Sequence, residues 1–437
     1  MTFDKVIQSP EGEPTVLPAS FFAANRQALL DTLGESALVL LAAGRAPHKT
    51  ADENYPHFAN RNFFYLCGIE QEGVLLLLHK AEGRTRETLF IQPTDAMYER
   101  WHGHMVKPDE AAVRSGLDDV QFMENFEAIF SDLAGQAGLP IWLDFSARSE
   151  QAAALKTWVT DKWADREPQD LTPFLIQLRI IKSDQEISLM HRAIRLTDNG
   201  IRAMLTRLAG HETDLREYHL WSAFAASLAD DGSLATAFAS IVAAGKNLFC
   251  LHYMTPYAQI GPDDLIQIDV GAIADGVCAD ISRAFPASGR FTPLQLSIYE
   301  MVRHCQETAF RIIRPGVSLK EVNEQCRRTA QDELTAAGIL KEGETVADYF
   351  WHSVSHHLGF DVHDTGSRES ILRPGMVVTV EPGIYISALN VGMRLEDDVL
   401  VTADGCRVLS QDIPREAAEI EAMMAQFSGQ FSGQLSV

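Results

Sequence analysis

Two aspartates flank a segment that predicts a β-hairpin. Asp269 ends an apolar run, Asp280 follows eleven residues later, and Asp275-Gly276 between them is typical of a two-residue hairpin turn. With that turn, Asp269 lies opposite Ser282, and the two carboxylates become diagonal neighbours about 7–8 Å apart on one face. Carboxylates this close repel each other unless a positive group lies between them, which favours a metal ion. The alternative is a turn residue and a solvated acid, because most acids are exposed.

Histidines are concentrated in one short stretch. Four of the chain's fourteen histidines lie within residues 352–363, namely His352, His356, His357 and His363. A lone histidine is more often structural, but four together beside a glycine favour a functional site. Their types alone do not distinguish metal ligands from acid and base groups.

Two further acids follow in the next segments. Glu381 ends a β-branched run and precedes Pro-Gly, while Arg394 and Glu396 alternate along a second predicted strand and so share a face. The alternatives are a solvated strand end for Glu381 and a surface ion pair for the other two, which would contribute little stability.

The combined donor set indicates the kind of metal. Four carboxylates and at least one imidazole, without a thiolate, suit a hard ion such as Mn²⁺ better than a cysteine-type zinc site. Four carboxylates also carry more negative charge than one divalent ion needs. We therefore expect two divalent ions about 3.5–4 Å apart, bridged by carboxylates.

The order of these residues resembles the pita-bread metallopeptidases, and among them aminopeptidase P. The pattern is Asp, Asp eleven residues later, Ser-His-x-Leu-Gly, Glu-Pro-Gly and Arg-x-Glu-Asp-Asp. Residues 53–56 and 60–68 are similar to that family's N-terminal domain, so the resemblance covers nearly the whole chain. It implies an α/β N-terminal domain followed by an α+β pita-bread catalytic domain, like that of creatinase and methionine aminopeptidase.

The resemblance also implies a role for each residue. Asp269 would bind one metal ion, His356 and Glu381 would bind the other, and Asp280 and Glu396 would bridge both. The family pattern selects His356 over the adjacent histidine as the ligand.

Other residues would handle the substrate. His252 would lie near the scissile bond, His363 would stabilise the oxyanion, and His352 would line a proline pocket. Arg394 would orient the neighbouring carboxylates, with Tyr385 close to it. Trp101 resembles a tryptophan that reaches a neighbouring subunit's active site, although plain apolar packing explains it equally well.

The implied activity is release of the N-terminal residue from peptides with proline at position two. Glu381 would shuttle a proton toward the leaving nitrogen. One alternative is a prolidase, which cleaves only Xaa-Pro dipeptides. A more distant one is a non-catalytic peptide-binding module, which the five retained ligands disfavour. Residues 365–372 and 386–392 look shorter than in some relatives, so the preferred peptide length is not specified.

The sequence also predicts the elements that position these residues. Apolar runs at 38–41 and 74–78 and helical spacing at 21–33 are typical of an α/β domain. Two prolines within 167–173 place a domain boundary near residue 175, giving domains 1–175 and 176–437.

Capping residues mark the next two helices. Ser183 and Glu186 form a predicted capping box, and Thr213 is the expected cap of the following helix.

Composition limits the partners and the compartment. The 437 residues carry a formal net charge of −23, which disfavours nucleic acid. No apolar run is long enough to cross a membrane, and the start does not resemble a signal peptide. None of the six cysteines forms a C-x-x-C pair, so we expect buried reduced thiols and a cytoplasmic protein. The expected partners are Xaa-Pro peptides and, from Trp101, further copies in a homodimer or homotetramer.

Overall fold

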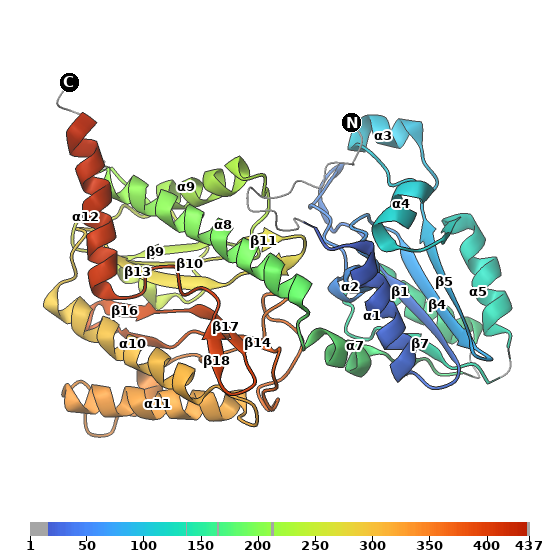
Figure 1. Cartoon of the computed structure of the whole chain (residues 1–437). Coiled ribbons are helices and arrows are strands. Elements are labelled where there is room, and N and C mark those ends of the chain that lie inside the picture. Colours follow the sequence, from blue (N-terminus) through green and yellow to red (C-terminus); the bar gives the residue numbers. More distant parts are fainter. Residues whose placement is uncertain (1–15, 137, 164–165, 211–213, 435–437) are drawn as a thin grey trace. The chain divides into compact units, whose positions relative to one another are not determined.

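The chain forms two compact units. The computed structural model describes residues 16–136, 138–163, 166–210 and 214–434 (Figure 1). One unit comprises Leu17–Arg179, and the other is built on Ile180–Val437. The boundary expected at residue 175 falls inside helix α7 (Thr172–Arg179), which continues past the prolines for two turns.

The N-terminal unit is built on a mixed six-stranded sheet with the order β6-β5-β4-β1-β7-β8. Its strands are β1 (Ala37–Ala42), β4 (Leu75–Ala81), β5 (Arg84–Ile91), β6 (Asp119–Phe122), β7 (Ile141–Leu143) and β8 (Gln169–Asp170). Strand β1 is fully buried, parallel to β7 and antiparallel to β4, which explains its continuous apolar run. A separate hairpin joins β2 (His48–Thr50) to β3 (Glu53–Asn54).

Helices cover this sheet and complete the α/β unit. They are α1 (Ala19–Thr32), α2 (Arg61–Cys67), α3 (Ala96–His102), α4 (Pro108–Ser115), α5 (Phe126–Ala134), α6 (Glu150–Lys162) and α7, with a 3₁₀ turn η1 (Met123–Asn125). Phe126 and Phe130 of α5 and Val159 of α6 form one buried cluster with Leu40 and Phe90 of the sheet. Burial of these large apolar side chains supplies the main driving force for the unit.

The C-terminal unit places short sheets between two helix pairs. Its helices are α8 (Asp184–Ala209), α9 (Glu217–Asp230), α10 (Pro293–Ile312), α11 (Leu319–Ala336) and α12 (Ala417–Gln434), with 3₁₀ turns η2 (Gly245–Phe249), η3 (Val346–Asp348) and η4 (Ser387–Leu389). In Figure 1 the strands lie between the α8–α9 pair and the α10–α11 pair. This is the expected α+β pita-bread arrangement.

Its strands fall into several small antiparallel sheets. One contains β9 (Ile241–Ala244), β10 (Leu265–Val270) and β13 (Ile281–Pro286), and another pairs β11 (Ile273–Ala274) with β12 (Val277–Cys278). A third contains β14 (Val377–Val380), β17 (Asp397–Val401) and β18 (Cys406–Val408), and β15 (Gly383–Ile386) pairs with β16 (Val391–Arg394). All four sheets contribute residues or neighbours to the site described below.

The predicted hairpin has the predicted register. Asp275 and Gly276 both have positive φ, 43° and 89°, as a type I′ turn requires. Ala274 pairs with Val277. Further along, Asp269 of β10 pairs with Ser282 of β13. The local turn chemistry therefore determines which residues face Asp269 across the sheet.

The start of α8 is also as predicted. The Ser183 hydroxyl accepts a hydrogen bond from the Glu186 backbone N–H, and the Glu186 carboxylate accepts one from the Ser183 N–H. Thr213 lies outside the described residues, and Arg216 occupies the N-cap position of α9.

Among the described residues, no helix has the length and apolar character needed to cross a membrane. All six cysteines are free. The expectation that they are buried is wrong for Cys250, which is exposed in the turn after η2, and Cys406 is only half-buried.

Candidate metal centre

Three residues from separate segments bring ligand atoms together. Asp280, His356 and Glu396 each offer one ligand atom, and these atoms lie within 4.8 Å of one another. The residues come from the start of β13, the segment before β14 and the junction of β16 and β17. Such a grouping of two carboxylates and an imidazole can hold a divalent ion.

The two hairpin aspartates line the same centre. The Asp280 backbone N–H donates to the Asp398 carboxylate, which holds this segment against β17. One oxygen of Asp269 accepts a hydrogen bond of 2.5 Å from the Arg394 guanidinium. The other oxygen, Oδ1, is buried and has no hydrogen-bond partner. A buried carboxylate oxygen without a partner is costly, and a cation would satisfy it.

His356 is held in the tautomer that a metal ligand needs. Its Nδ1 lies 3.0 Å from the His357 carbonyl oxygen, so Nδ1 donates its proton there. Nε2 is then free, and it lies 3.4 Å from Asp280 Oδ2 and 3.6 Å from Glu381 Oε1. A backbone acceptor on the other ring nitrogen is the usual way of orienting a ligating histidine. The ring of His357 instead packs against Gly366.

Glu381 and Glu396 enter from two neighbouring strand ends. Glu381 directly follows β14, and its backbone N–H donates to the Val354 carbonyl at 2.8 Å. Glu396 follows β16, and its N–H donates to the Ser282 carbonyl at 3.1 Å. These bonds fix the backbone of Glu396 against β13 and the backbone of Glu381 against the segment that carries His356.

The expectation that Arg394 and Glu396 lie on one continuous strand is wrong. The backbone leaves the β15–β16 sheet after Arg394 and joins β14 at Asp397, because each strand finds a different partner. The two side chains nevertheless bond to the same hydroxyl group, that of Ser282. The Ser282 hydroxyl accepts a bond from Arg394 Nε and donates one to Glu396 Oε2, both 2.9 Å long.

Ser282 is a site residue that the sequence reasoning missed. Its side chain is fully buried and links the arginine to the glutamate. The predicted hairpin register already placed it opposite Asp269, so the pairing itself was the available signal.

The centre carries uncompensated negative charge. Burial, and then the charge of Asp269, raises the pKa of Asp280 well above its usual range. Burial, and then Asp280, does the same to the pKa of Glu396. Burial raises the pKa of Glu381 to about 7, although His356 and Arg394 oppose the rise. Arg394 alone does not balance four carboxylates, so the residues present fit a site for divalent cations.

A second group of side chains borders these carboxylates. His352 Nδ1 lies 3.6 Å from Glu381 Oε2, and its Nε2 lies 2.9 Å from the Tyr385 hydroxyl. Burial lowers the pKa of His352 to about 4 and raises that of Tyr385 to about 12, so both side chains are neutral at pH 7. Trp351, which the sequence reasoning did not single out, stacks on the Tyr385 ring at 4.7 Å.

His363 and His252 lie on the His356 side of the centre. The rings of His363 and His356 are 4.2 Å apart. Partial shielding of its ring from water, and then the charges of His356 and His252, lowers the pKa of His363. Both His363 and His252 are exposed, so the structure leaves them accessible to a substrate.

Trp101 belongs to the other unit. It lies in the last turn of α3 with 77% of its surface exposed. The alternative of plain apolar packing is therefore wrong within its own unit. Met97 and Tyr98 on the same helix are exposed as well.

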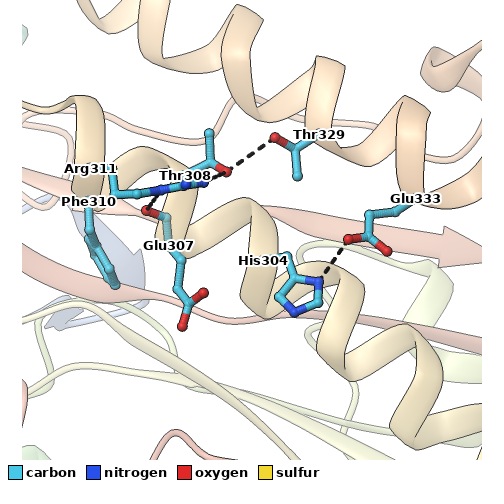
Figure 2. A pocket seen from close by; sticks show the side chains of 7 residues that line it. All are labelled: His304, Glu307, Thr308, Phe310, Arg311, Thr329 and Glu333. Atoms are coloured by element: carbon cyan, nitrogen blue, oxygen red, sulfur yellow. Dashed lines mark hydrogen bonds and ion pairs between the residues drawn. The ribbon is translucent and has the colours of Figure 1, made fainter.

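A cavity of about 570 Å³ between α10 and α11 is lined by none of these residues. Figure 2 shows that His304 and Glu333 point toward each other there, with 2.8 Å between Nδ1 and Oε1. Arg311 donates to the Thr308 hydroxyl in the same cavity. Its charged groups thus have partners of their own.

Comparison with known proteins identifies the family. Residues 188–403 match metallopeptidase family M24, and residues 22–142 match the aminopeptidase P N-terminal domain. The Xaa-Pro aminopeptidase of Escherichia coli is 32% identical, with 92% of this chain and 97% of that protein aligned. The Xaa-Pro aminopeptidase of Haemophilus influenzae is 31% identical over 93% of this chain and 98% of the relative.

Solved structures agree with these sequence matches. A putative aminopeptidase P from Bacillus anthracis superposes with a TM-score of 0.89 at 36% identity, covering 94% of this chain and 99% of that one. The likeness extends over both units and their order. The chain therefore belongs to metallopeptidase family M24 and carries the N-terminal domain of aminopeptidase P.

Proposed function

We propose that this metallo-exopeptidase is an Xaa-Pro aminopeptidase that uses two Mn²⁺ ions. It releases the N-terminal residue from peptides with proline at position two. The observation that carries the proposal is the convergence of Asp280, His356 and Glu396, in a chain similar over almost its full length to Xaa-Pro aminopeptidases.

Five side chains would hold the two ions. We assign Asp269 to one ion, His356 and Glu381 to the other, and Asp280 and Glu396 to both. The unpartnered oxygen of Asp269 and the free Nε2 of His356 support these assignments. Ions held here would act as Lewis acids and make hydroxide available near neutral pH.

Glu381 is the proposed proton carrier. Its carboxylate lies among the proposed ligands, with one oxygen 3.6 Å from His356 Nε2 and the other 3.6 Å from His352 Nδ1, so it borders both the ions and the proposed substrate pocket. The nitrogen of an Xaa-Pro bond has no N–H and leaves as a secondary amine, which requires a proton. A carboxyl group beside the scissile bond can deliver that proton.

The histidines would bind and orient the substrate. His363 would donate to the carbonyl oxygen of the scissile bond, and His252 would lie beside that bond. His352 and Tyr385 are neutral and joined by a hydrogen bond of 2.9 Å, which suits the wall of a pocket for an apolar proline ring.

Arg394 would position the carboxylates without contacting the substrate. It bonds directly to Asp269 and reaches Glu396 through Ser282. An arginine held at both ends in this way restricts the two acids to one orientation each.

Other features of the chain extend the proposal. We assign Trp101 to a contact with a neighbouring subunit in a homodimer or homotetramer, since its ring is exposed together with Met97 and Tyr98 of the same helix. We also propose a domain boundary within α7, close to residue 175, a cytoplasmic location, and peptides as substrates, without nucleic acid or membrane partners.

The prolidase alternative is not favoured, because the two relatives described above align with both units and are Xaa-Pro aminopeptidases. A non-catalytic binding module is disfavoured by the complete set of five acidic and histidine ligands.

The test is hydrolysis of Arg-Pro-Pro and Ala-Pro by metal-stripped enzyme with Mn²⁺ added back. We expect release of arginine from the tripeptide, lost in Asp280→Ala and retained in Asp332→Ala, an exposed control on α11. Cleavage of the dipeptide alone would move the protein to the prolidases, and cleavage of neither would contradict catalysis.

A further inference from the structure

The segment that carries His356 and His363 has little secondary structure of its own. Residues 355–366 form no helix or strand, apart from an isolated bridge between His357 and Val378. Side-chain and backbone contacts must therefore determine where the two functional histidines lie. We call residues 355–366 the histidine loop.

A buried ion pair anchors this loop. Lys182 Nζ lies 2.5 Å from Asp364 Oδ2, and the two side chains are 1% and 0% exposed. Asp364 directly follows His363, and its backbone N–H donates to the His357 carbonyl at 2.8 Å. The salt bridge thus holds Asp364, next to His363, and the backbone bond from Asp364 ties it to His357, next to His356.

The pair fits tightly against the loop backbone. A Cβ at Gly359 would lie 2.0 Å from Asp364 Oδ2 and 2.5 Å from Lys182 Nζ, so only glycine is tolerated there. The Gly359 carbonyl accepts a hydrogen bond from the Cys278 N–H at 2.8 Å. The loop is consequently fixed to the metal-binding hairpin on one side and to the ion pair on the other.

Lys182 is itself held in place by two segments. Its backbone N–H donates to the Gly375 carbonyl at 2.8 Å, just before β14. It immediately precedes the Ser183–Glu186 capping box, which fixes the start of α8. A buried ammonium beside it has a cost in free energy unless it makes a specific pair.

We propose that Lys182 is a positioning residue of the metal centre. Its ammonium holds Asp364, and through Asp364 it fixes the loop that presents His356 to the metal ions and His363 to the substrate. The inference rests on the proposed function of that site. It predicts that the charge of Lys182, which pairs with Asp364 and with none of the five proposed ligands, controls metal affinity and turnover.

The experiment compares three variants with the wild type. Lys182→Met removes the charge and keeps most of the side-chain volume. Lys182→Met combined with Asp364→Leu replaces the whole pair by apolar groups, which often restores stability. Arg26→Met is the control, because Arg26 forms an ion pair with Glu87 at 2.8 Å within the N-terminal unit and is only 1% exposed.

Three quantities are measured for each protein: the melting temperature, the Kd for Mn²⁺ by calorimetry, and kcat and KM on Arg-Pro-Pro. For Lys182→Met we expect Mn²⁺ binding weakened about 10-fold and kcat lowered about 10–100-fold, with KM changed less than about 2-fold. The double variant should regain melting temperature but neither metal affinity nor kcat. The control should lose melting temperature only.

Two results would overturn the inference. One is Lys182→Met with metal affinity and kcat within about 2-fold of wild type. The other is a double variant that recovers both along with its stability, since the ion pair would then serve folding alone. If Lys182→Met does not fold, the double variant decides the question. If the wild type binds Mn²⁺ but cleaves no Xaa-Pro peptide, the proposed function fails, while the calorimetry still tests the inference.

Discussion

Removal of the Ser282 hydroxyl should destabilise the metal centre, because this group supports Arg394 and Glu396. Ser282→Ala deletes one bond from Arg394 Nε and one to Glu396 Oε2, each 2.9 Å long. A hydrogen bond to a charged group contributes about 1.5–3 kcal/mol, and an alanine leaves room for a water that recovers part of it. We therefore expect the free energy of unfolding of the metal-loaded enzyme to fall by about 2 kcal/mol.

Activity should fall as well, because Glu396 and Asp269 share Arg394 as their orienting group. Loss of such a supporting contact typically costs about 10–100-fold in activity or metal affinity. The assays are urea denaturation and kcat/KM on Arg-Pro-Pro. Ser222→Ala, on the exposed side of α9, is the matched control. A change below about 0.5 kcal/mol together with kcat/KM within about 2-fold of wild type would refute the role of Ser282.

Three further predictions concern the metal and the fold. Chelation should lower the melting temperature measured by calorimetry. Mn²⁺ at about 100 times its Kd should then raise the free energy of unfolding by about 2.7 kcal/mol. An unchanged melting temperature would mean that the native state binds no metal. In the metal-free protein, the folded state binds a proton on Glu381 more tightly than the unfolded state does, because burial raises the folded pKa to about 7. The free energy of unfolding should therefore fall as the pH rises from the ordinary pKa of an unfolded glutamate, about 4, to about 7. A melting temperature that rises over that window would contradict this sign. Arg283→Met should cost about 3–5 kcal/mol in urea denaturation, because it removes the buried guanidinium that lies 2.8 Å from Asp397 and leaves that carboxylate with the more distant Arg415 as its cation. A loss under about 1 kcal/mol would show that the pair contributes little.

Local chemistry made part of the site predictable from sequence. Asp275-Gly276 adopts the positive φ angles that its turn type requires, and this sets Asp269 opposite Ser282. The capping box at Ser183 follows from the same kind of short-range bonding. In both places the interacting groups lie within a few residues of one another, so the sequence order determines the geometry.

Long-range contacts were not predictable in the same way. The strand through Arg394 breaks because β16 and β17 pair with different strands, and no local pattern records that change of partner. The Lys182–Asp364 pair joins residues 182 positions apart, and Trp351 covers Tyr385 from another segment. These contacts depend on how the helices and sheets pack, which the sequence periodicity does not specify.

The most direct test of the metal centre is a crystal structure of the enzyme grown with Mn²⁺, with anomalous scattering recorded at the manganese edge. We expect two peaks per chain among Asp269, Asp280, His356, Glu381 and Glu396. No peak at these residues, or manganese bound only elsewhere on the acidic surface, would contradict it.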